Sequence, residues 1–216
     1  QQVPGGEDFS WIGVGLDELV RIRIRWSPVM AVAVGNARQQ VLNSYGSQLP
    51  QNSRDSTVAP VLEGLAVDAF VFGRVQRYQN RLKVEYQGAL RKKRNRVKKV
   101  LSFNGEVHEA MIVPGQVASG LHKISGQPMM AELMQHYSRP PTSSFYAFRD
   151  YAKALVAYRM GDFNGAVKLC SMAIGHDGSF IEARYLMAES LYGSGNFNDT
   201  LVTFQDTLGE ASSVLG

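Results

Sequence analysis

Four tyrosines near the C-terminus have the residue type and spacing best suited to molecular recognition. They form two pairs with an internal spacing of seven residues, and the second pair follows the first by 34 residues. A spacing of seven places each pair on one face of a helix. Tyrosine offers a large, rigid contact area with a polar tip, which suits capture of a peptide. The candidate partner-binding groove comprises Tyr151, Tyr158, Arg159, Tyr185, Glu189 and Tyr192.

Packing is the alternative interpretation of the same tyrosines. A helical repeat places aromatic residues between neighbouring hairpins whether or not a ligand binds. We rank packing ahead of ligand contact on these grounds, and both interpretations stay open at this point.

A basic run in the middle of the chain is the second feature with chemical potential. Clustered like charges stay solvated unless an anionic partner is present, so a solvated hairpin tip is the plain alternative. Aromatic residues that could stack on bases are absent from the run, and we therefore rank an acidic protein or anionic membrane above nucleic acid. The run comprises Arg91, Lys92, Lys93, Arg94, Arg96, Lys98 and Lys99.

Catalytic and metal-binding patterns are weak in this sequence. The histidines His108, His122, His136 and His176 have no spacing that would bring two onto one helical turn. Cys170 is the only cysteine and falls at an apolar repeat position, where a buried thiol is expected. No glycine-rich phosphate loop is present. We expect neither an enzyme nor a metal site, and no cofactor.

A repeat organises the C-terminal region. Residues 157–164 recur as residues 191–198, with glycine at 161 and 195 and phenylalanine at 163 and 197. A period of about this length is typical of stacked helical hairpins. The pattern predicts helices over residues 145–160, 163–174, 181–194 and 197–208, preceded by a linker over residues 139–144. Gly161 and Gly195 suit the left-handed geometry that ends a helix.

The region from residue 1 to 138 predicts an α/β layer domain. Apolar spacing predicts helices over residues 10–25 and 56–67 and after Pro114, the last facing a sheet through Val117, Leu121 and Ile124. Residues 39–55 suit a loop. Strands are expected over residues 29–34, 69–78, 82–90 and 97–103, and together they predict a mixed sheet with packed helices.

The C-terminal pattern resembles the tetratricopeptide repeat over residues 147–214. The resemblance rests on Gly161-Asp162-Phe163-Asn164-Gly165-Ala166 and its second copy at residues 195–200. Thr200 and Thr207 depart from it by replacing the usual alanines, and the proline between repeats is absent. The family implies an all-α array whose first helices line a groove. Two repeats are fewer than an independently stable array needs, so we expect further repeats, docking on the N-terminal domain or a partner.

Residues 5–125 resemble the TolB N-terminal-like family. Residues 7–19 are similar to its opening helix, residues 66–75 to its first hairpin strand and residues 81–84 to its second. The family's initial apolar strand is missing, and a basic run replaces its short later turn. The missing strand suggests truncation at Gln1, or a sheet that another segment completes. The resemblance implies a non-catalytic module of envelope assemblies, or of regulators that carry helical repeats.

The composition agrees with a globular chain: 216 residues, 44% hydrophobic content and a net charge of +4. No apolar run reaches the length of about 20 residues that a membrane span needs. We expect a non-catalytic scaffold that binds partner proteins, forms homo-oligomers or larger assemblies, and lies in the periplasm or cell envelope, with the cytoplasm left open. A regulatory module of a larger signalling protein and a nucleic-acid binder are the alternatives.

Overall fold

The computed structural model describes residues 10–31, 69–90 and 96–215, which divide into two compact units. We call residues 20–31, 69–90 and 96–139 the sheet unit, and residues 10–19 and 140–215 the helical unit. The chain leaves the sheet unit after Arg139, inside the predicted linker. Residues 10–19, which we expected to belong with the N-terminal domain, group with the helical hairpins instead.

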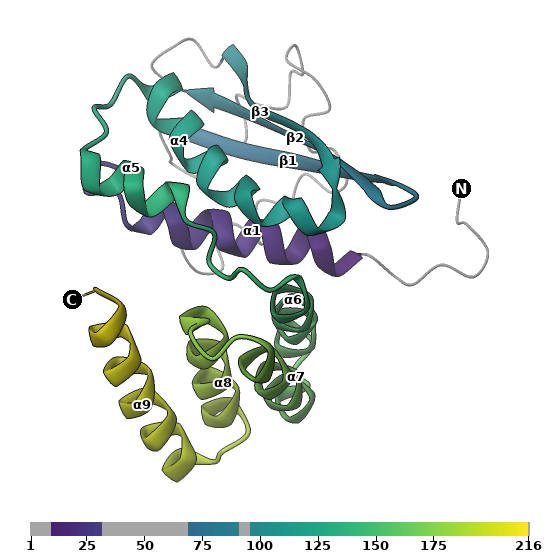
Figure 1. The fold of residues 1–216 in the computed structure, drawn as a ribbon, viewed down its shortest axis with the longest axis vertical. Helices are drawn as coiled ribbons and strands as arrows, with labels where there is room; N and C mark the ends of the chain where they lie inside the picture. The colour runs from purple at the N-terminus through teal and green to yellow at the C-terminus, as the bar shows by residue number, and fades with distance from the viewer. Residues whose placement is uncertain (1–9, 32–68, 91–95, 216) are drawn as a thin grey trace. The chain divides into compact units, whose positions relative to one another are not determined.

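An antiparallel sheet forms the centre of the sheet unit. Strands β1 (Ala69–Tyr78), β2 (Arg81–Leu90) and β3 (Arg96–Glu106) lie in the order β1-β2-β3 (Figure 1). Gln79, at the tip of the first hairpin, has a positive φ of 56°. Leu82, Val84 and Tyr86 of β2 are buried, while Lys83 and Glu85 on the opposite face form an ion pair of 3.2 Å. This alternation is the period of two that predicted the strand.

Helix α4 (Val113–Ser125) covers one face of the sheet after the short helix η2 (Val107–Ile112). Val117 and Leu121 are buried, and Ile124 lies close to Gly88 of β2, as the sequence predicted. A Cβ atom at Gly120 would lie 2.8 Å from the carbonyl oxygen of Val100, so this glycine permits the close approach of helix and strand.

Helix α5 (Ala131–Ser138) completes this side of the sheet unit and is an element that the sequence did not predict. Leu133 and Tyr137 pack against Ala118 of α4 and against Ile24. Ile24 lies in the second half of α1 (Ser10–Arg25). The helix has only eight residues and no side-chain N-cap, which explains why its pattern was too weak to detect.

One predicted strand is wrong in its described part. Residues 29–31 form a turn and irregular backbone, and Val29 is exposed rather than buried. The apolar run follows Ser27 and Pro28 directly, and its first residues belong to the turn at that point. The described sheet is therefore purely antiparallel, not mixed. Residues 32–34, the predicted loop at 39–55 and the predicted helix at 56–67 lie outside the described residues.

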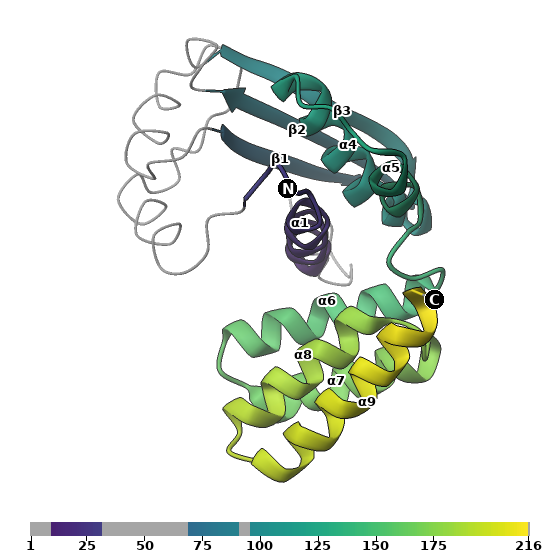
Figure 2. The same ribbon diagram turned by 90° about the vertical axis from the view of Figure 1, so that its left-hand side faces the viewer.

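Helical hairpins make up most of the helical unit. The first joins α6 (Phe145–Arg159) to α7 (Phe163–His176), and the second joins α8 (Ile181–Gly193) to α9 (Phe197–Leu215) (Figure 2). Each helix packs on its neighbours in chain order. The first half of α1 packs on α6, where the rings of Trp11 and Phe148 lie edge-on with centroids 5.9 Å apart.

The turns inside the two hairpins are copies of each other. Gly161 and Gly195 have φ values of 81° and 82°, as their predicted role at a helix end requires. The next amide in each copy closes the turn: Asp162 N donates to the carbonyl of Ala157 at 3.0 Å, and Asn196 N to that of Leu191 at 2.9 Å. The repeat in the sequence is thus a repeat in backbone geometry.

Small residues line the seams between paired helices. Ala154, Ala166 and Ala173 are completely buried. Thr200 and Thr207 are buried at the equivalent positions of α9, where their hydroxyls donate to the carbonyls of Asn196 at 2.8 Å and Thr203 at 2.6 Å. These internal bonds let threonine replace alanine without leaving a buried hydroxyl unpaired.

Candidate functional site: an aromatic face at the end of the helical unit

Tyr151 belongs to the packed interior and not to an accessible groove. Its side chain is 2% exposed and lies against Phe180, with ring centroids 4.9 Å apart. Burial raises the pKa of its hydroxyl well above the ordinary value. For this tyrosine the packing interpretation holds, because the segment leading into α8 covers the ring.

Tyr158 and Arg159 occupy an intermediate position. Tyr158 is half-buried and lies edge-on to Phe163 at 5.6 Å. Burial, followed by the nearby carboxylate of Glu189, raises the pKa of the Tyr158 hydroxyl. Arg159 Nη2 forms an ion pair of 3.1 Å with Glu18 Oε2 of α1. The predicted residues of α6 are therefore mainly engaged within the helical unit.

Tyr185 and Tyr192 are the predicted residues that reach the surface, with exposed fractions of 51% and 64%. Each lies edge-on to a phenylalanine of α9, with ring centroids 5.7 Å apart for Tyr185 and Phe204 and 5.4 Å apart for Tyr192 and Phe197. The predicted groove did not include the α9 side chains. A signal was present, because residues 197, 201, 204 and 208 are apolar at helical spacing.

These side chains form one surface, which we call the terminal face. Within the helical unit, α9 stands at the end of the row of helices (Figure 1). The members of the terminal face share an α8 or α9 origin and an apolar or aromatic character; they are Tyr185, Tyr192, Phe197, Leu201, Phe204 and Leu208. Phe204 is half-buried and the others are exposed. Exposed apolar side chains gathered on one helical face make this surface the candidate for contact with another molecule.

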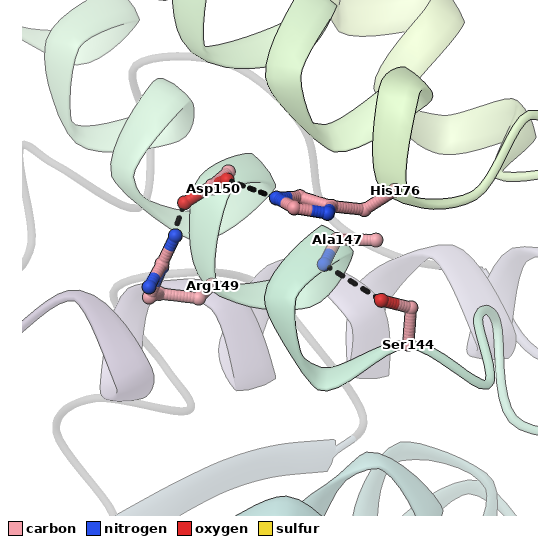
Figure 3. A network of polar contacts seen from close by, with 5 residues as sticks. All are labelled: Ser144, Ala147, Arg149, Asp150 and His176. Carbon is pink, nitrogen blue, oxygen red and sulfur yellow. Dashed lines mark hydrogen bonds and ion pairs between the residues drawn. The ribbon is translucent and has the colours of Figure 1, made fainter.

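Asp150 is the one buried carboxylate of the first hairpin, and its polar partners come from both α6 and α7. Asp150 Oδ1 accepts a hydrogen bond from Arg149 Nε at 2.7 Å, and Asp150 Oδ2 lies 3.4 Å from His176 Nε2 (Figure 3). Ser144 caps α6 by accepting a hydrogen bond from the Ala147 amide at 3.2 Å. The guanidinium of Arg149 also lies 5.2 Å from the ring centroid of Tyr146. The Arg149 contact lies within α6, and the longer His176 contact is the one that reaches across from α7.

Two of the histidines approach each other across Tyr137 in the sheet unit. The ring of Tyr137 lies 5.9 Å from that of His122 and 6.1 Å from that of His136. His136 Nε2 lies 2.8 Å from Arg23 Nη1, so the imidazole accepts a hydrogen bond from a cation. A metal ion would compete with that cation for the same nitrogen. Across residues 10–31, 69–90 and 96–215, no group of three or more His, Cys, Asp or Glu could hold a metal.

An open depression of about 190 Å³ lies between α7, α8 and α9. Ser171, Arg184 and Asp206 are among the residues that line it. Small-molecule sites are usually concave spaces of roughly 300–1,000 Å³. This depression is smaller, and we assign it no ligand.

The basic run lies outside the described part of the chain. Residues 91–95 are not described, and only the backbone of Arg96, Lys98 and Lys99 is, as part of β3. The role of the run therefore stays a prediction.

Comparison with known proteins adds no family to this geometry. No protein-family model, curated protein or solved structure matches the chain. The helices that the structure describes include none with the length and apolar character needed to cross a membrane.

Proposed function

We propose that this chain is a non-catalytic scaffold or adaptor that binds partner proteins through its helical unit. The observation that carries the proposal is the terminal face, where five of the six aromatic and apolar side chains are exposed to solvent. Tyrosine and phenylalanine in such clusters supply much of the energy of protein interfaces.

The family resemblances belong to the same proposal. Two hairpins with equivalent turns support a tetratricopeptide-like array, and an antiparallel hairpin covered by α4 is compatible with a TolB-like domain. Such modules suit a bacterial envelope assembly, so we propose a periplasmic or envelope-associated location. The sheet unit would supply further contacts, including self-association, within that assembly.

Photo-crosslinking in cells of the source organism tests this function. A photoreactive residue replaces Tyr192 in one variant and Tyr146, an exposed tyrosine of α6, in the control. We expect discrete adducts from position 192 and not from position 146. An identified partner should then lose at least tenfold in affinity on Tyr185→Ala/Tyr192→Ala, with the thermal midpoint unchanged. Identical adducts at both positions, or unaltered affinity, would contradict the proposal.

A further inference from the structure

A buried arginine in the sheet unit holds the C-terminal end of α5. Arg23 of α1 is 5% exposed and donates through Nη1 to His136 Nε2 at 2.8 Å and to the His136 carbonyl at 3.3 Å. Its Nη2 donates to the carbonyl of Arg139 at 3.0 Å. The two backbone contacts persist at any pH, since a cation suits the last carbonyls of a helix. The contact to the imidazole does not, because only a neutral ring can accept a hydrogen bond.

A proton on His136 would meet positive charge from two directions. Arg23 faces the ring from α1, and Arg139 follows at the end of α5. Burial, followed by these two cations, lowers the pKa of the ring from 6.5 to about 4. His122 of α4, across the intervening tyrosine ring, is itself buried. Glu132, one turn earlier in α5, is exposed, so water screens the attraction that it offers. The His136 ring is half-buried, so solvent protons can reach it.

Few other contacts hold α5 in place. Of its eight residues only Leu133 and Tyr137 are buried, and no side chain caps its start. Irregular backbone flanks the helix at residues 126–130 and 139–144, so it can leave without breaking another helix or a strand. Short segments with few buried apolar contacts open at a low free energy. The contact between arginine and imidazole is therefore a large share of what docks this helix.

We propose that α5 is an acid-released helix of the sheet unit. It docks on α4 while His136 is neutral and detaches once that ring is protonated, because the buried guanidinium of Arg23 then faces a second cation in place of an acceptor. Detachment uncovers Ala118 of α4 and Ile24 of α1, on which α5 packs. The inference concerns a conformational change within the sheet unit and goes beyond the protein-binding role of the helical unit.

Native-state hydrogen exchange of the full chain measures the release. Amide protection, corrected for the intrinsic exchange rate at each pH, gives the opening equilibrium of each element. We expect the hydrogen-bonded amides of α5 to open at least tenfold more readily than those of β2, with a smaller urea dependence. Between pH 7.5 and pH 5 the α5 opening equilibrium should rise about tenfold. A constant α5 opening, or α5 and β2 opening together with equal urea slopes, would overturn the inference.

Substitutions on the two sides of the hydrogen bond give matched variants. His136→Gln keeps an acceptor that does not titrate. We expect it to abolish the acid-induced rise in α5 opening, while the α7 amides in the same sample stay unchanged. Arg23→Met removes the cation. It should raise α5 opening already at pH 7.5 and reduce the further rise in acid to less than about threefold. An undiminished rise in either variant would overturn the inference.

The other histidine beside Tyr137 supplies the last control. His122→Gln removes a second titratable ring from the same contact, and we expect the acid response of α5 to persist. NMR titration of the imidazole Hε1 resonances identifies the ring that takes the proton. His136 should titrate together with the release of α5, below the ordinary pKa of 6.5. Titration of His136 at the ordinary pKa, or an acid response that disappears in His122→Gln, would overturn the inference.

Discussion

Arg23 and His136 show how a single hydrogen bond couples protonation to folding. Burial, followed by the positive charges of Arg23 and Arg139, lowers the pKa of His136 from 6.5 to about 4. The neutral ring accepts from the Arg23 guanidinium, which itself is buried and also donates to the carbonyl of Arg139 at 3.0 Å. A protonated ring would lose this bond and face a like charge.

The stability of the sheet unit should therefore decrease in mild acid. Because the unfolded chain binds the His136 proton more readily than the folded one, the free energy of unfolding falls as pH drops from 6.5 toward about 4 and levels off below. We expect a loss of about 1–2 kcal/mol for a partly screened ring. Urea unfolding at several pH values measures it. His136→Gln keeps an acceptor without titrating and should flatten the profile; an equally steep profile would exclude His136 as the cause.

The Asp150 network predicts an asymmetry between its partners. The Asp150 side chain is 2% exposed, whereas those of Arg149 and His176 are 26% and 41% exposed. Water can hydrate the Arg149 guanidinium once the carboxylate is removed, but it cannot reach the carboxylate once Arg149 is removed. We expect Arg149→Leu to cost about 2–4 kcal/mol and Asp150→Leu about 1 kcal/mol. Chemical unfolding compares the two variants, and the reverse order would show that the carboxylate is not the buried charge that matters.

At the scale of elements, the packing of α1 on α6 depends on a glycine. A Cβ atom at Gly15 would lie 2.6 Å from Ala152 Cβ and 2.9 Å from the ring of Phe148, while one at Gly13 would meet nothing within 4 Å. Gly15→Ala should therefore destabilise the helical unit by about 1–3 kcal/mol. Gly13→Ala, in the same helix, should stabilise by up to about 1 kcal/mol. Thermal unfolding of the pair tests this contact, and equal effects would argue that α1 and α6 are not in close contact.

The sequence alone predicted the helices and strands whose pattern is local. The 34-residue repeat predicted the starts of α6 to α9, and alternation predicted β1 and β2 with their turn. Helix α5 was not predicted because eight residues are too few to show a clear helical period. The apolar run after Pro28 has the composition of a strand, but composition does not reveal that its first residues turn.

The candidate site could be predicted only in part, for a different reason. Tyr151 and Tyr185 occupy equivalent positions, and no local signal distinguishes the buried one from the exposed one. What separates them is the neighbour: the segment at Phe180 covers Tyr151 at 4.9 Å. The burial of Tyr151 thus depends on a residue of the second hairpin, which the sequence around Tyr151 does not reveal.

At the scale of the whole molecule, the basic run is the feature most open to a simple solution test. Net charge and its distribution determine non-specific attraction, and phosphate contacts by seven cations would make binding to DNA fall steeply with salt. We expect DNA affinity to be weak and anionic vesicles containing phosphatidylserine to bind more tightly. Anisotropy and vesicle sedimentation over a salt series compare them with a variant carrying Lys92→Gln, Lys93→Gln and Arg94→Gln. A steep DNA salt slope that this variant abolishes would reverse the ranking.

The buried thiol of Cys170 can report on local opening of the helical unit. The thiol is fully buried, so alkylating reagents cannot reach it in the closed state. Burial also raises the pKa of the thiol to about 12, so the reactive thiolate does not form there. Because the chain has one cysteine, iodoacetamide modifies a single position, and the rate of its incorporation counts openings of the α7 seam without any engineered label. A ligand that clamps the hairpins together should slow that rate in proportion to its occupancy.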